Sequence, residues 1–160
     1  MAYTMQAEGM EAVSELLNRL GEEAESAAAQ GLYEGAGVMA DEVRKAAEAI
    51  RTAPFKWARK GTTRLPSPEE KEIIVNAAPG IAKFRKNGSE VDTSVGYARS
   101  GYANLKGHQR AVAQIANAVN SGTSFMQAQP FFRKSVRQGQ QKAAEAIARK
   151  IEEQVDNMTK

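Results

Sequence analysis

The chain has 160 residues, of which 42% are hydrophobic and 26% are charged, and its formal net charge is +3 at pH 7. These values are typical of a single soluble globular domain and argue against disorder along the whole chain. The absence of cysteine excludes disulfides and thiol catalysis, and no apolar run approaches the roughly 20 residues that a membrane-spanning helix needs.

Charge is distributed unevenly along the chain. Residues 1–52 contain ten acidic and four basic residues, residues 53–110 contain five acidic and eleven basic ones, and residues 111–160 contain four acidic and seven basic ones. An acidic first third and a basic remainder predict a dipolar subunit. Such a subunit could stack head-to-tail with its neighbours or present a basic face to nucleic acid. The alternative is two solvated faces of opposite sign.

Residues 9–52 carry the pattern of an amphipathic helix. Apolar residues recur every three or four positions, at Met10, Val13, Leu17, Leu20, Ala24, Ala27, Leu32, Met39, Val43, Ala46 and Ile50. Gly31, Gly35 and Gly37 interrupt the middle, and each costs a helix about 1 kcal/mol relative to alanine. The sequence therefore predicts either one long helix, weakened there, or two helices with a break near residues 30–31. Because the stripe is rich in alanine, a place in the core is favoured over a coiled-coil seam.

A short helix is predicted over residues 68–77, after a basic loop that begins where Pro54 ends the first helix. Ser67 is placed to cap this helix, and Pro68 suits its first turn. Glu70 follows the serine by three residues and completes a capping box.

A β-hairpin is predicted over residues 81–97. Asn87-Gly88 is a favoured pair for a two-residue type I′ turn, and folding about it sets Phe84 opposite Val91. Apolar and polar residues then alternate between the two faces. Since a hairpin alone is marginally stable, we expect a further strand to complete a small antiparallel sheet.

The segment that follows is ambiguous. Residues 99–110 are polar and contain two glycines, which indicates a loop. Residues 111–119 fit a strand through the alternation of Ile115, Asn117 and Val119, and a helical face through Val112, Ile115, Ala116 and Val119. The need of the hairpin for further strands favours a strand here.

A turn at residues 120–124 leads to a C-terminal helix over residues 130–157. Its apolar side is formed by Val136, Ala143, Ile147, Ile151 and Val155. Together the elements predict a single α+β domain over residues 1–160. In it, a small antiparallel sheet packs with long N-terminal and C-terminal amphipathic helices.

The sequence offers few groups for catalysis, and we expect no enzyme, no cofactor and no metal site. His108 is the only histidine and lies in a polar loop, and no cluster of histidines and carboxylates has the spacing of metal ligands. The glycines at residues 31–37 lack the Gly-Lys-Ser/Thr ending of a phosphate loop. The N-terminal residues have no basic patch before an apolar stretch, so we expect no secretory signal and folding in the cytoplasm.

Three features together resemble a family of phage proteins. They are a Gly-Met-Glu-x-x-x-x-Leu-Leu start at Gly9, an Asn-Ser-Gly-Thr-Ser-Phe-Met turn at residues 120–126, and a Gln-Pro-Phe-Phe-Arg-Lys-Ser-Val stretch at residues 129–136. The combination resembles the tail-component family of lambda-like siphophages, whose members are also described as head–tail joining or tail-completion proteins. The likeness in element order covers nearly the whole chain.

What the resemblance implies is a structural role in the tail or neck of a virion that is assembled in the cytoplasm of a host bacterium. The family is similar in fold to small α+β proteins that form rings, commonly hexameric, between the capsid connector and the tail tube. The implied partners are other copies of the chain, connector or head-completion proteins, and tail-tube or tail-terminator proteins. Non-specific contact with genomic DNA in the channel is implied too, and contact with membranes is not. The sequence does not separate tail completion from tail termination or head stopping.

The residues of this signature are the candidates for contacts between subunits. The simplest explanation of Gly122 and Thr123 is a turn that requires unusual backbone geometry. Their functional explanation is that they position the loop that contacts a neighbouring subunit. Adjacent helix residues point about 100° apart, so of Phe131 and Phe132 one is expected in the core and the other at an interface. The interface candidates are Gly122, Thr123, Phe125, Pro130, Phe131 and Phe132.

The rival hypothesis is a small nucleic-acid-binding accessory protein that uses the basic residues 53–110. Trp57 lies among lysines and arginines in this segment, and aromatic residues interleaved with cations can bind single strands. The basic-surface candidates on the predicted hairpin are Lys83, Arg85 and Lys86. No sequence motif for nucleic acid accompanies them.

Overall fold

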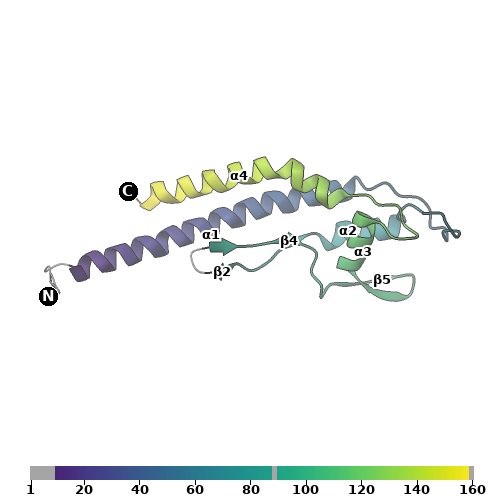
Figure 1. Cartoon of the computed structure of the whole chain (residues 1–160), viewed down its shortest axis with the longest axis horizontal. Coiled ribbons are helices and arrows are strands. Elements are labelled where there is room, and N and C mark those ends of the chain that lie inside the picture. The colour runs from purple at the N-terminus through teal and green to yellow at the C-terminus, as the bar shows by residue number, and fades with distance from the viewer. Residues whose placement is uncertain (1–9, 88–89, 159–160) are drawn as a thin grey trace, which may run out of the picture.

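Two long helices run side by side along the length of the molecule (Figure 1). The computed structural model describes residues 10–87 and 90–158 of the chain. Helices α1 (Met10–Glu48) and α4 (Phe131–Met158) pack against each other in antiparallel directions. The chain between them lies along α1 and at its C-terminal end, where the long loops project away from the start of α1 and the end of α4 (Figure 1). The predicted α+β class with long terminal helices is confirmed.

Helix α1 is continuous through its glycines, so the long helix is formed and the two-helix alternative is not. It ends at Glu48, four residues before the predicted end. Gly31 and Gly35 lie against Ile151 and Ile147 of α4, and both glycines are buried. Their cost to the helix is therefore offset by the close approach of two backbones, which a larger residue would prevent.

The register of this helix pair leaves the start of α1 without cover from α4. Because Gly31 lies against Ile151 and the helices are antiparallel, the last residue of α4, Met158, reaches only the level of residue 24. Burial agrees with this register, since Ala24 is exposed and Ala27 is buried. Residues 10–23 of α1 thus extend beyond the end of α4, as Figure 1 shows.

The predicted capping of helix α2 (Pro68–Ala77) is confirmed. The Ser67 hydroxyl accepts a hydrogen bond of 3.2 Å from the Glu70 N–H, and a carboxylate oxygen of Glu70 accepts one of 2.7 Å from the Ser67 N–H. Pro68 occupies the first turn. Since all three signals are local, the sequence located this helix correctly.

The strands form three two-stranded antiparallel sheets within the described residues. They pair as β1 (Gly80–Ile81) with β4 (Val95–Gly96), β2 (Arg85–Asn87) with β3 (Glu90–Asp92), and β5 (Tyr102–Leu105) with β6 (His108–Ala111). The small antiparallel sheet expected for the fold is thus divided into separate ribbons.

The hairpin over residues 81–97 forms with a register that differs from the predicted one. Lys86 pairs with Val91, so the predicted pairing of Phe84 with Val91 is wrong. Gly88, the second residue of the predicted Asn87-Gly88 turn, lies outside the described residues. Charge favours the observed register, because it sets Arg85 directly opposite Asp92, and their side chains form an ion pair of 3.2 Å.

Residues 102–111 form a hairpin, so the prediction of a loop over residues 99–110 is wrong from residue 102 onward. Strands β5 and β6 are joined through Lys106 and Gly107, which have φ angles of +53° and +81°. Positive φ at both central residues is the geometry of a type I′ turn. The Gly107 N–H also donates a hydrogen bond to the side-chain oxygen of Asn104.

Helix α3 (Val112–Ser121) replaces the strand predicted at residues 111–119. Its buried face consists of Val112, Ile115, Ala116 and Val119, spaced by three and four residues, and it contacts both α2 and α4. The helical alternative was the correct one, since this face fills the core. No third strand joins the hairpin within the described residues, because β5 and β6 pair with each other. Ala111 occupies the cap position without a side-chain hydrogen bond, so the sequence carried no capping signal.

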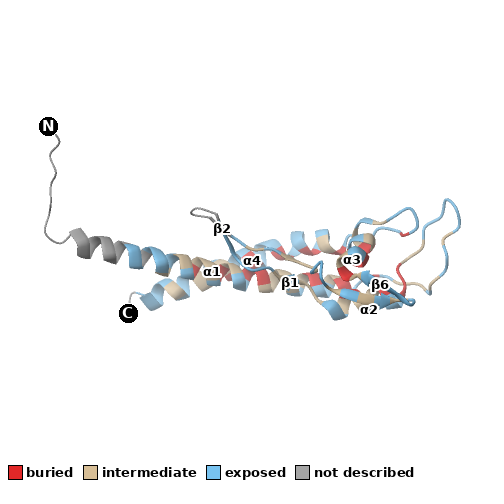
Figure 2. Cartoon of the chain, turned by 90° about the horizontal axis from the view of Figure 1, so that it is seen from below, coloured by how far each residue is buried: buried red, intermediate tan, exposed pale blue. Residues whose placement is uncertain are grey.

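The core lies where all four helices approach one another. Buried residues follow the contact between α1 and α4 and gather at α3 (Figure 2). The central cluster consists of Val43, Ala47, Ile50, Ile74, Ile115, Ala116, Val119, Met126 and Phe131. Helix α4 spans the region predicted for the C-terminal helix almost residue for residue, and its first residue, Phe131, belongs to this cluster.

Candidate protein interface

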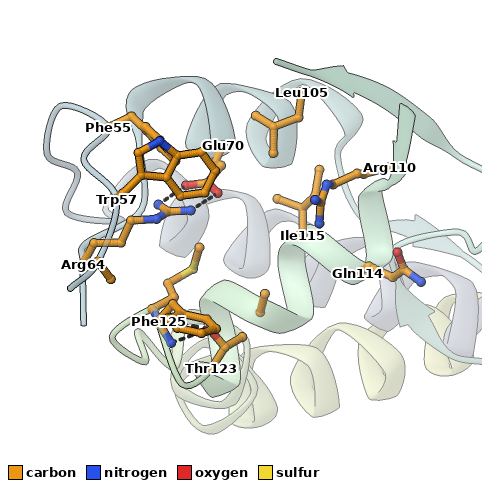
Figure 3. Close-up of a pocket in the computed structure, with 13 residues that line it drawn as sticks. Phe55, Trp57, Arg64, Glu70, Leu105, Arg110, Gln114, Ile115, Thr123 and Phe125 are labelled. Carbon is orange, nitrogen blue, oxygen red and sulfur yellow. Dashed lines mark hydrogen bonds and ion pairs between the residues drawn. The ribbon is translucent and has the colours of Figure 1, made fainter. Parts of the chain in front are cut away.

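A cavity of about 360 Å³ opens at the loop end of the molecule (Figure 3). Its walls come from the loop of residues 53–66, the β5–β6 hairpin, helix α3 and residues 123–126, with Glu70 of α2 at its inner side. We call this region the tip. The cavity is lined mainly by apolar side chains, among them Phe55, Trp57, Leu105, Ile115, Phe125 and Met126.

Two aromatic side chains that line the cavity are exposed. Trp57 is 86% exposed and Phe125 is 61% exposed. Trp57 lies edge-on to Phe55, with ring centroids 5.1 Å apart, and Lys106 lies over the Phe55 ring. Figure 3 shows Trp57 and Arg110 on opposite sides of the cavity. Exposed aromatic side chains beside an apolar hollow are typical of protein contact surfaces.

An ion pair between Arg64 and Glu70 forms the polar wall of the cavity. The two Nη atoms of Arg64 donate hydrogen bonds of 2.6 and 2.7 Å to the two carboxylate oxygens of Glu70. The side chains are 18% and 5% exposed, respectively. Burial raises the pKa of Glu70, but the hydrogen bonds and charge of Arg64, with the bond from the Ser67 N–H, outweigh it and lower the pKa overall. Both groups are therefore satisfied within the fold.

The loop that follows α3 is ordered by its own backbone. Gly122 has a φ of +76°, and its N–H donates to the Ala118 carbonyl, which ends the helix. A Cβ atom at Gly122 would lie 3.0 Å from the Cβ of Ala128. The Thr123 hydroxyl then accepts hydrogen bonds from the N–H groups of Phe125 and Met126. This part of the prediction, a turn that needs unusual backbone geometry, is met at Gly122.

Two further connections fix the loop to the first half of the chain. The Arg64 N–H donates to the Phe125 carbonyl, and the Gln127 N–H donates to the Arg64 carbonyl, so residues 64 and 126 form a parallel bridge. The Gln129 side chain donates to the Arg51 carbonyl and accepts from the Arg51 N–H. The backbone that bears Phe125 is therefore held on both sides.

The structure places the six interface candidates in three environments. Phe131 is buried in the core, and Phe132 is half-buried beside it, with its N–H bonded to the Asn120 side chain. Gly122 is half-buried in the turn. The exposed candidates are Thr123, Phe125 and Pro130, of which Thr123 and Phe125 line the cavity. Of the two adjacent phenylalanines, Phe131 is thus the one in the core. An interface role for the other five candidates stays a prediction.

The three basic-surface candidates do not lie at the tip. All are exposed on the β2 side of the molecule, but Arg85 is paired with Asp92 and Lys86 is paired with Glu25 of α1 at 2.5 Å. Only Lys83 has no ion-pair partner within the part of the chain that the structure describes. These pairs reduce the positive charge that the hairpin offers to a phosphate backbone.

Sequence reasoning missed part of the tip. Trp57 and its basic loop were noticed, but Leu105 and Arg110 were assigned to a polar loop and lie instead on strands that face the cavity. The sequence signal that could have located them is Lys106-Gly107. Glycine readily adopts the positive φ of a two-residue hairpin turn, and such a turn would have placed a strand on each side of it.

Within residues 10–87 and 90–158, no three histidine, aspartate or glutamate side chains gather in a way that could hold a metal ion. Nor does any helix of this part of the chain have the length and apolar character to cross a membrane. Comparisons with protein-family models, with curated proteins and with solved structures find no match for the chain.

Proposed function

We propose that this chain is a structural subunit of the neck of a tailed bacteriophage, which joins head to tail or completes the tail as part of a ring. The observation that carries the proposal is the conformation of residues 120–132, the segment that resembles the tail-component family. Its backbone is fixed by Arg64, Arg51 and α3, while its Phe125 side chain is exposed at the cavity that Trp57 also lines.

A fixed backbone with exposed aromatic side chains suits a permanent contact between proteins. Ordering a mobile loop on binding costs free energy, and a loop that is already held by hydrogen bonds avoids most of that cost. Aromatic side chains bury large apolar areas and are enriched at the centres of interfaces. The tip therefore fits an assembly role better than a catalytic one.

The neighbours that we propose are further copies of the chain, a connector or head-completion protein on one side, and a tail-tube or tail-terminator protein on the other. Genomic DNA would pass through the channel of such a ring. The elongated shape, with loops at one end and the start of α1 and the end of α4 at the other, gives one subunit two distinct ends for two different neighbours (Figure 1).

The test is electron microscopy of particles from a phage that carries this gene, after the gene has been disrupted. We expect filled heads and separate tails, and recovery of joined particles when the intact gene is supplied from a plasmid. Joined, infectious particles without the gene product would overturn the proposal.

Nucleic-acid binding is the second candidate, and one observation favours it. Residues 53–66 and 99–111, which form much of the tip, contain seven lysines and arginines and no aspartate or glutamate. Trp57 lies among them with its ring exposed, where it could stack on a base.

Binding of duplex and single-stranded DNA at several salt concentrations would test this candidate. If the tip carries it, replacing Lys56, Arg59 and Lys60 by alanine should weaken binding and reduce its dependence on salt. The matched control replaces Lys83, Arg85 and Lys86 by alanine, where two of the three charges are already paired. Equal effects of the two triple variants would indicate binding to scattered charge instead of to a site.

A further inference from the structure

Among the described residues, the start of α1 has no cover from α4, the helix that packs along the rest of its length. Residues 10–23 run beyond the last residue of α4. Isolated helical segments of this length are marginal in water and generally depend on packing of an apolar face. In the sequence of this segment, Met10, Val13, Leu17 and Leu20 follow one another at steps of three and four, which defines one apolar stripe.

The same segment is acidic. It contains Glu11, Glu15, Glu22 and Glu23 and a single base, Arg19, which forms an ion pair of 3.5 Å with Glu23. An acidic helix with one apolar stripe calls for a partner surface that combines an apolar hollow with positive charge.

The tip has both properties. Its cavity is lined mainly by apolar side chains, with Glu70 at its inner side, and residues 53–66 and 99–111 around it contain seven lysines and arginines. Of these cations, Arg64 is neutralised by Glu70, and Lys56, Lys60 and Arg110 are exposed. The neighbouring helix α2 also presents Glu69, Lys71 and Glu72, which leaves the tip clearly positive.

We infer that residues 10–23 of one copy of this chain dock on the tip of a second copy. The two surfaces lie at opposite ends of the long axis, so one molecule cannot bring them together (Figure 1). The contact is therefore head-to-tail, and repetition of such a contact generates a closed ring or an open filament. The inference deepens the proposed function and rests on it for the ring, since a ring needs a heterologous contact of this kind.

Reversal of charge at each end provides the test. One variant changes the start of α1 and carries Glu11→Lys and Glu15→Lys. The other changes the tip and carries Lys56→Glu, Lys60→Glu and Arg110→Glu. We expect the wild-type chain to assemble with increasing concentration in light scattering. Each variant alone should show a dissociation constant raised by about 100-fold or more, because like charges then face each other. An equimolar mixture of the two variants should assemble again, because their charges are complementary.

The control variant carries Arg44→Glu and Arg149→Glu, two exposed cations on the helices outside the tip, and should assemble like wild type. Thermal unfolding of each variant establishes that it is folded. A wild-type chain that stays monomeric at every concentration, or a mixture that fails to assemble although both variants are folded, would overturn the docking contact.

Failure of this contact and failure of the neck role give different results. If the mixture stays monomeric while gene disruption still separates heads from tails, the neck role stands and the docking contact is wrong. If the mixture assembles while disruption leaves particles joined, the contact stands in a protein with another role.

Discussion

A Cβ atom at Gly35 of α1 would lie 2.5 Å from the Cγ1 atom of Ile147 on α4 and 3.1 Å from the Ala143 carbonyl oxygen. Gly31 has the same relationship to Ile151, at 2.9 Å. Both distances are shorter than van der Waals contact, so these two positions admit only glycine at the observed separation of the helices. Gly139 of α4 also lies close to α1, since a Cβ atom there would lie 3.2 Å from side-chain atoms of Met39 and Glu42. The packing of α1 on α4 is thus set by glycines from both helices.

Gly35→Ala should lower the free energy of unfolding by about 1–2 kcal/mol, as overpacking at the helix contact exceeds the gain in helix propensity. Gly37→Ala is the matched control, because no atom lies within 4 Å of its Cβ position in the same helix. It should raise stability by about 1 kcal/mol. Urea denaturation measures both. Equal effects of the two substitutions would show that α4 does not approach α1 at Gly35.

Glu70→Gln should lower the free energy of unfolding at pH 7 by about 2–4 kcal/mol, because it leaves the charge of Arg64 buried without its partner. The lowered pKa of Glu70 also makes the wild-type chain sensitive to acid. Its contribution is present above the ordinary pKa of 4.5 and is lost as the pH falls through the lower pKa of the folded state. Stability measured from pH 7 to pH 3 should therefore fall less in the variant than in the wild type. Parallel curves would contradict the role of this ion pair.

Gly107→Ala should destabilise the protein by about 1–2 kcal/mol, since alanine is strained at the positive φ of the β5–β6 turn. Gly96→Ala, at a strand position with open space around its Cβ, should change stability by less than about 0.5 kcal/mol. Because Leu105 and Arg110 of this hairpin line the cavity, Gly107→Ala should weaken assembly as well. Unchanged stability would show that the turn is not type I′ in solution.

Tyr97→Phe should raise the free energy of unfolding by about 1 kcal/mol, because the buried Tyr97 hydroxyl has no hydrogen-bond partner in the described residues. Burial also raises the pKa of Tyr97 to about 12. The stability of the wild-type chain should therefore not depend on this group below pH 10, its ordinary pKa, and should fall as the pH rises from 10 to about 12, whereas the phenylalanine variant lacks this dependence. The absorbance of tyrosinate follows this titration. Tyr102→Phe, at an exposed position, serves as control and should leave stability unchanged.

The elements that the sequence located correctly are those whose signals are local or long. The capping box of Ser67 and Glu70 spans four residues and is formed as predicted. The two long helices were recognised because their apolar stripes repeat over many turns. Residues 111–119 are too short for periodicity to separate a helix from a strand, and the choice is made by the packing of α3 on α2 and α4.

The remaining differences depend on contacts between distant parts of the chain. From the sequence alone, the glycines of α1 are expected to destabilise the helix. Their role in the close approach of α4 depends on Ile147 and Ile151, which are distant in the sequence. The tip is built from four separate segments, so Leu105 and Arg110 could not be grouped with Trp57 from spacing alone. Phe125 was selected through the resemblance, and its exposure follows from the hydrogen bonds of Arg64 to its backbone.

The pairing of the first helix with the last has a consequence for synthesis on the ribosome. Glu42 and Lys142 form an ion pair of 3.0 Å across this contact and are 100 positions apart in the sequence. At a translation rate of about 5–20 residues per second, roughly 5–20 s separate their incorporation. During that time the nascent chain holds α1 without α4, and its apolar stripe is open to chaperones or to other nascent chains. Closure of the long helix pair must follow the synthesis of α4, so α1, although it is made before α4, is among the last elements to complete its native contacts.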